Sequence, residues 1–226
     1  MFTDNDNFAA NKSAMKPSSK PLALITLMIL LLQTTLSAQN AAAGHRAYVE
    51  SVEAERAAKD AEFSNPDETP LRNDNMMHFK GLNYFRISDK YRIVARLEIY
   101  DHPDTIRMKT TTERLPLYLI YGKASFSLKN RNFSLTIYRN VGLMSKEGYE
   151  DYLFVPFRDE TSGKQSYAGG RYVDARISGD STIVIDFNKA YNPYCVYNSK
   201  KYSCPVPPDE NYLPVTVKAG EKDFAH

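Results

Sequence analysis

The sequence of 226 residues has no tryptophan, two cysteines and four histidines. A structural zinc site needs about four nitrogen or sulfur ligands, so this scarcity argues against one. The formal net charge is only +2 and no block of like charge occurs, so a basic surface for nucleic acid is not expected. No internal repeat and no cofactor-binding fingerprint occur either. We therefore expect no cofactor, no metal and no nucleic-acid partner.

Long apolar runs are also absent, with one exception at residues 22–36. Lys16 and Lys20 precede this run, and the small residues Ser37 and Ala38 follow it. Basic, apolar and small-residue segments in this order are typical of a secretory signal peptide. The alternative is a membrane anchor, but about 20 apolar residues are needed to span a bilayer. We expect cleavage after Ala38 and an exported protein, periplasmic or secreted, with no membrane span thereafter.

The signal peptide thus occupies residues 1–38, and Met15 is an alternative start because a complete signal follows it. The remainder, residues 39–226, has a length that suits one domain. Nothing in it indicates an oligomeric state.

Within that domain, residues 42–63 are rich in Ala, Glu, Lys and Arg, which favours a helix. From about residue 79 to 224 the pattern is β, as in residues 91–100, where apolar and polar residues alternate. We expect eight or nine short strands, with turns at 121–122 and 130–132, a hairpin at Gly179-Asp180, and a last strand at 213–220. The predicted fold is mainly β, an antiparallel sandwich or partly closed barrel with one N-terminal α-helix.

Two charged residues lie at the same end of a predicted hairpin, on the faces of its strands that are otherwise apolar. Asp159 follows Leu153, Val155 and Phe157 at period two, and Arg171 begins the return strand on the same face. A buried unpaired charge is very costly, so the two should meet or line a cavity. The alternatives are a structural ion pair and a pocket for a small anionic ligand.

The loop between these charges is polar and rich in glycine, and glycines let backbone N–H groups converge on an anion. It is not a phosphate-binding loop of the Walker type, and no Gly-x-Ser-x-Gly elbow occurs. For the pocket we name these candidate ligand-binding residues: Asp159, Thr161, Gly163, Tyr167, Arg171 and Asn188. In a hydrolase of unfamiliar type, Asp159 would be the general base, and Ser162 or Tyr167 would supply a hydroxyl.

Both cysteines lie in one tyrosine- and proline-rich segment, residues 190–211, which we call the strap. Cys195 and Cys204 would enclose a loop of about ten residues, and a disulfide there would contribute roughly 2.7 kcal/mol. The alternatives are a zinc site, a catalytic thiol and two reduced buried thiols. The prolines favour extended backbone outside the sheet, so the strap should cover an apolar face.

Other polar residues have structural explanations. Asp186 and Asn188 end a strand, where such side chains commonly bond the next turn. His102 lies between two aspartates in "DHPDT", which a proline turn explains better than a metal.

Several ordered segments, "FRDETSGKQSYAGGRYVD", "IDFNKAYNPYCVY", "SCPVPPDEN" and "VKAGEK", carry a family resemblance. They resemble the bacterial family known as domain of unknown function 1684, over about residues 45–224, and "FKGLNYF" fits it too. Against longer members, the chain looks shortened between "FKGLNYF" and Asp159. The resemblance implies a set of positions that are characteristic of the family, but it implies no activity. Besides the ligand-binding candidates above, these positions are Asp186, Asn192, Cys195, Cys204, Pro205, Asn211 and Glu221. Members that look cytoplasmic carry the same cysteines, which weakens a purely disulfide role.

We therefore expect an exported envelope protein that is a ligand-binding or structural module. Its pocket would lie at the Asp159–Arg171 hairpin, with the strap as its roof. The structural residues would be Cys195, Cys204, Asp186, Asn192, Asn211 and Glu221.

Overall fold

A computed structural model describes residues 20–179 and 181–224, with side chains from residue 39 onward. The chain divides into two compact units, residues 1–47 and residues 48–226. One long helix, α1 (Lys20–Ser64), contains the predicted helix 42–63 and begins well before it. Residues 1–19 of the predicted signal peptide lie outside the described residues, so cleavage stays a prediction. Over the described side chains, no helix has the length and apolar character needed to cross a membrane.

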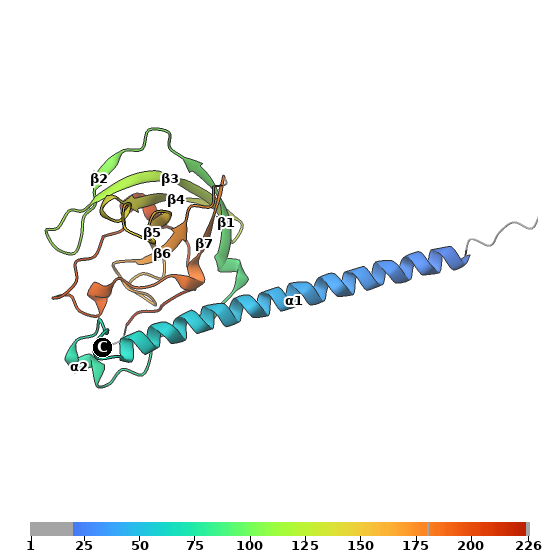
Figure 1. The fold of residues 1–226 in the computed structure, drawn as a ribbon, viewed down its shortest axis with the longest axis horizontal. Coiled ribbons are helices and arrows are strands. Elements are labelled where there is room, and N and C mark those ends of the chain that lie inside the picture. The colour runs from blue at the N-terminus through green and yellow to red at the C-terminus, as the bar shows by residue number, and fades with distance from the viewer. Residues whose placement is uncertain (1–19, 180, 225–226) are drawn as a thin grey trace, which may run out of the picture. The chain divides into compact units, whose positions relative to one another are not determined.

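The second unit is a nearly closed, barrel-like antiparallel sheet, which confirms the predicted mainly β fold (Figure 1). Its strand order is β6-β5-β4-β3-β1-β7; β2 pairs with β3, and β8 pairs with β5 in parallel. The strands are β1 (Arg92–Ile99), β2 (Thr105–Arg107), β3 (Leu117–Leu128), β4 (Arg131–Asn140), β5 (Tyr152–Asp159), β6 (Arg171–Arg176), β7 (Thr182–Asp186) and β8 (Tyr212–Leu213). A one-turn helix, α2 (Asn73–Met76), follows α1.

Two apolar layers lie on opposite faces of this sheet. The inner layer follows the predicted period-two faces, including Ile93, Ala95 and Leu97 on β1, all buried. The outer layer contains Tyr118, Phe154 and Tyr172, and residues of the strap pack over it. Strand β5 is therefore buried on both faces at its centre.

Three predicted local features are wrong. Tyr121-Gly122 is no turn but a β-bulge inside the continuous strand β3, and the turn that follows is formed by Lys129 and Asn130, both at positive φ. Strands β6 and β7 form no hairpin around Gly179, because β7 pairs with β1 instead; Asp180 itself lies outside the described residues. Of the predicted last strand, 213–220, only Leu213 belongs to a strand, β8; the rest inserts Val215, Val217 and Ala219 into the inner core.

Gly122 is needed at the bulge because there is no room for a side chain. A Cβ there would lie 2.2 Å from the backbone oxygen of Glu98, which cannot move without breaking the β1–β3 pairing. We expect Gly122→Ala to lower the free energy of unfolding by about 1–3 kcal/mol, as overpacking does. Urea denaturation checks this, with Gly142→Ala as the control, since its Cβ would meet only the Asn140 side chain at 3.3 Å. Equal stability of the two variants would contradict the steric explanation.

Candidate functional site

The sequence-predicted pair does meet inside the barrel. The Arg171 guanidinium lies 3.2 Å from Asp159 Oδ1, and both side chains are fully buried. Arg171 also donates to the backbone oxygens of Val217, Ala219 and Glu221. It thereby ties β6 to the irregular C-terminal segment, which explains how that segment stays in the core without strand pairing.

The Asp159 carboxylate is held by the chain on its other side. It accepts hydrogen bonds from the Thr161 backbone at 3.1 Å, the Thr161 hydroxyl at 2.9 Å and the Val217 backbone at 2.7 Å. Ser162 Oγ is 3.5 Å from Asp159 and accepts from its backbone N–H. A general base must reach a substrate proton, whereas these bonds engage both carboxylate oxygens within the core.

The glycine-rich loop also bonds to itself. The Gly163 N–H donates to the Ser166 oxygen at 2.8 Å, and the Gly170 N–H donates to the Tyr167 oxygen at 3.1 Å. Three more N–H groups, on residues 164–166, all donate to the Thr161 oxygen. Binding of an anion here stays a prediction, and these contacts favour the structural alternative.

The remaining predicted positions form buried polar contacts elsewhere. The Asn188 amide accepts a hydrogen bond from the Ser88 N–H and donates to the Ser88 oxygen and the Tyr48 hydroxyl. The Tyr48 hydroxyl in turn donates to Asp186. None of these partners belongs to the Asp159 loop. Asn211 bridges β4 and β5 through Thr136 and Pro156. The Glu221 carboxylate pairs with Lys59 at 2.6 Å. It also accepts hydrogen bonds from the Asn192 N–H and the Tyr197 hydroxyl, which anchors the strap.

Cys195 and Cys204 are buried free thiols in contact with each other. The Cys195 backbone N–H donates to Cys204 Sγ at 3.0 Å, and the Tyr167 hydroxyl hydrogen-bonds Cys195. Across the described side chains, no three His, Cys, Asp or Glu residues gather closely enough to hold a metal ion. His102 lies in a bend before β2.

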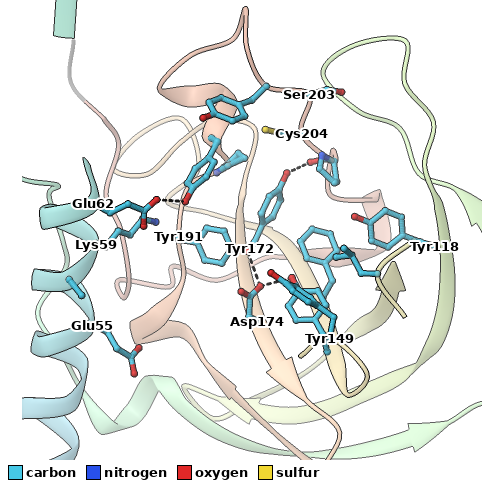
Figure 2. Close-up of a pocket in the computed structure, with 18 residues that line it drawn as sticks. Glu55, Lys59, Glu62, Tyr118, Tyr149, Tyr172, Asp174, Tyr191, Ser203 and Cys204 are labelled. Atoms are coloured by element: carbon cyan, nitrogen blue, oxygen red, sulfur yellow. Dashed lines mark hydrogen bonds between the residues drawn. The ribbon is translucent and has the colours of Figure 1, made fainter. Parts of the chain in front are cut away.

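A large pocket lies on the outer face of the same hairpin. Its volume is about 740 Å³, which is within the usual range for small-molecule sites. The floor is formed by β5 and β6 through Tyr152, Phe154, Tyr172 and Asp174, which alternate with the inner-face residues. Residues 55–62 of α1 form one wall and the strap forms another, as Figure 2 shows. The strap is therefore a pocket wall, but on the face opposite the Asp159–Arg171 pair.

Aromatic rings dominate this tyrosine pocket. Seven of its eighteen lining residues are tyrosines, contributed by β3, the β4–β5 connection, β5, β6 and the strap: Tyr118, Tyr149, Tyr152, Tyr172, Tyr191, Tyr194 and Tyr202. Several are fixed by hydrogen bonds, since Tyr194 donates to Glu62 at 3.0 Å and Tyr172 donates to the Pro205 oxygen. The ring faces are thus held in place before any ligand arrives.

Asp174 provides the charge at the floor of the pocket (Figure 2). Its Oδ1 accepts hydrogen bonds from the Tyr152 and Tyr191 hydroxyls, each at 2.8 Å. In the described part of the chain, no side chain donates to its Oδ2. The Asp174 side chain is exposed toward the pocket, yet the surrounding protein limits its solvation enough to raise its carboxyl pKa above the usual range.

The lining charges are mostly negative. Among the lining residues, Glu55, Glu62 and Asp174 carry carboxylates and Lys59 carries an ammonium. Glu55 is paired with Lys189, outside this lining, at 2.5 Å. The Lys59 ammonium lies 4.9 Å from the centre of the Tyr191 ring and is paired with the buried Glu221. The pocket wall therefore already holds an ammonium group against an aromatic face.

The sequence prediction missed Asp174 and the pocket tyrosines outside the strap, because it followed only the inward faces of the hairpin. A signal was present: Tyr152, Phe154 and Tyr172 put aromatic residues on the outward face of both strands. An outward aromatic face needs a cover, and the strap, predicted to cover an apolar face, is that cover.

Comparison with known proteins agrees with this fold. The family described as "Protein of unknown function (DUF1684)" matches residues 77–222. The solution NMR structure of an uncharacterized protein from Haloarcula marismortui is similar, with a TM-score of 0.63 and 34% identity, over 80% of this chain and 98% of that chain. A search of curated proteins found no match. Because the family match covers well over half of the chain, as the resemblance implied, this protein belongs to the DUF1684 family of proteins of unknown function.

Proposed function

We propose that the protein is a small-ligand-binding module whose tyrosine pocket takes an organic cation, such as an alkylated ammonium compound. The observation that supports this most is Asp174, a carboxylate with one uncommitted oxygen on the floor of an aromatic pocket. Aromatic faces attract cations through their quadrupole, and cages of such rings bind quaternary ammonium groups.

The charge of the pocket favours a cation over the anion that we expected from the sequence. An anionic ligand would face Asp174 and Glu62, whereas Glu55 is paired with Lys189 and the lining ammonium of Lys59 is engaged with Glu221. The Asp159–Arg171 pair, where the anion was expected, then has a structural role. This assignment also places the general base of the hydrolase hypothesis outside the ligand pocket.

Tyrosine fluorescence tests the proposal, because the chain has 16 tyrosines and no tryptophan. We expect tetramethylammonium to change the fluorescence saturably, and acetate at equal ionic strength to leave it unchanged. Identical responses to both ions would reflect ionic strength alone and would contradict the proposal.

Binding should depend on pH through Asp174. Because its carboxyl pKa is raised by burial, the group loses its charge at a higher pH than an ordinary aspartate does. We expect tetramethylammonium affinity to be greatest near neutral pH and to fall on acidification, beginning above the usual aspartate range. The check is a series of fluorescence titrations at decreasing pH; a flat profile would remove Asp174 from the site.

We also propose that the chain is exported, on the order of basic residues, apolar run and small residues that ends at Ala38. We expect the protein recovered from fractionated cells to begin at Gln39, as read by N-terminal sequencing. Recovery of the uncleaved chain from the cytoplasmic fraction would contradict export.

A further inference from the structure

The two cysteines are arranged for chemistry with each other. Besides the 3.0 Å contact from the Cys195 N–H to Cys204 Sγ, the thiols hydrogen-bond one another. Thr111 fixes Cys204 from the other side: its hydroxyl accepts from the Cys204 N–H at 3.1 Å, and its N–H donates to the Cys204 oxygen at 2.9 Å. The sulfurs are therefore held near each other by backbone contacts, not by chance side-chain placement.

The two sulfurs have different surroundings. Cys204 lines the tyrosine pocket, so a small molecule inside the pocket can reach it. Cys195 does not line the pocket, but 6% of it is exposed, so only a small oxidant such as hydrogen peroxide can reach its sulfur. The hydrogen bond from the Cys204 thiol, followed by those of Thr111, its own backbone and Tyr167, lowers the pKa of Cys195 to about 7. The same bond between the sulfurs raises the pKa of Cys204. Near neutral pH, Cys195 is therefore partly ionised, whereas Cys204 keeps its proton.

We propose that Cys195 and Cys204 form a reversible thiol–disulfide pair, oxidised by a small peroxide and reduced by a small thiol that enters through the pocket. This goes beyond the proposed function and does not depend on which ligand the pocket binds. It also gives the pair a role distinct from that of a permanent structural bridge.

Oxidation takes two balanced steps. The Cys195 thiolate attacks one oxygen of hydrogen peroxide, breaking the O–O bond to give a Cys195 sulfenic acid and hydroxide. Cys204 then gives up its proton, and its sulfur attacks Cys195 Sγ, forming the S–S bond and releasing the sulfenic oxygen as water. The peroxide is reduced, and the two cysteines lose two electrons in total.

Reduction begins at Cys204, the sulfur that lines the pocket, and releases Cys195 first. A thiolate in the pocket attacks the accessible Cys204 Sγ, and Cys195 leaves; a thiol of low pKa leaves faster. A second external thiolate then attacks the external sulfur of the mixed disulfide and releases Cys204. The external thiols are thereby oxidised to their disulfide.

The experiment uses the reduced full-length protein. We expect hydrogen peroxide to remove both alkylatable thiols, to produce a Cys195–Cys204 cross-linked peptide by mass spectrometry, and to do so faster as pH rises through 7. Dithiothreitol should restore both thiols. Thiols that stay free, a disulfide between chains, or irreversible sulfinic acid without the bridge would each overturn the proposal.

Two variants separate the roles of the sulfurs. In Cys204→Ser the sulfenic acid of Cys195 should persist and be trapped by dimedone, whereas Cys195→Ser should react at least tenfold more slowly at pH 7. Circular dichroism confirms that each variant is folded, and the wild-type result stands alone if one is not. Equal rates and no dimedone adduct would show that the sulfurs do not have these roles.

Discussion

Arg171→Met is expected to lower the free energy of unfolding by about 3–5 kcal/mol, the usual cost of removing one partner of a buried ion pair. The methionine fills much of the space of the arginine stem but leaves the Asp159 carboxylate buried without its cation. It also removes the donors to the backbone oxygens of Val217, Ala219 and Glu221. The C-terminal segment then loses its main polar attachment to β6.

Urea denaturation followed by circular dichroism measures this effect. The matched control is Arg176→Met on the same strand, because Arg176 forms an exposed ion pair with Asp151 at 2.6 Å, and exposed pairs contribute little. We expect that control to be almost as stable as the wild type. If both variants had the same stability, the Asp159–Arg171 pair would not hold the fold as we describe.

Asp174→Asn is expected to weaken tetramethylammonium binding by roughly 10–100-fold, the loss typical of a contact to a charged group. The amide oxygen of the asparagine can still accept from Tyr152 and Tyr191, so the pocket keeps its shape. What disappears is the negative charge on the pocket floor.

Asp174→Asn should weaken binding without lowering the free energy of unfolding. Because burial raises the Asp174 pKa, the folded state binds its proton more tightly than the unfolded state does. Ionised Asp174 therefore opposes folding at neutral pH, and its removal should leave stability unchanged or increased. Lost binding together with lost stability would indicate a structural role instead; unchanged binding would exclude the carboxylate from the site.

The inner core of the barrel was predictable because it follows a strict period of two. The alternation on β5 and β6 predicted that Asp159 and Arg171 point inward, and the cost of buried charge predicted that they meet or line a cavity. The 3.2 Å contact between the two buried side chains shows that the first alternative holds.

Features that depend on distant backbone were not predictable. Gly122 resembles a turn residue in sequence, but its absent side chain is needed because the backbone of β1 passes beside it. Gly179 suggests a hairpin, yet β7 pairs with β1, which lies some 90 residues earlier in the chain. The segment after Leu213 alternates like a strand because it fills the core, while side-chain donors such as Arg171 replace sheet pairing.

The tyrosine pocket forms only where segments that are far apart in the chain come together. Its floor comes from β5 and β6, one wall from α1 and the other from the strap, and no local pattern joins them. The strap was correctly expected to cover an apolar face. Which face it covers is set by the pairing of Tyr191 with Tyr172, a long-range contact.

The most direct test of the central claim, that the tyrosine pocket is a cation site, is calorimetric titration of the wild-type protein with choline and with 3,3-dimethyl-1-butanol. The second compound has the same shape as choline but no charge. We expect choline to bind to one site per chain at least tenfold more tightly than the alcohol, since only choline carries the positive charge that the Asp174 carboxylate and the ring faces attract. Equal affinities, or no binding of choline, would contradict the claim.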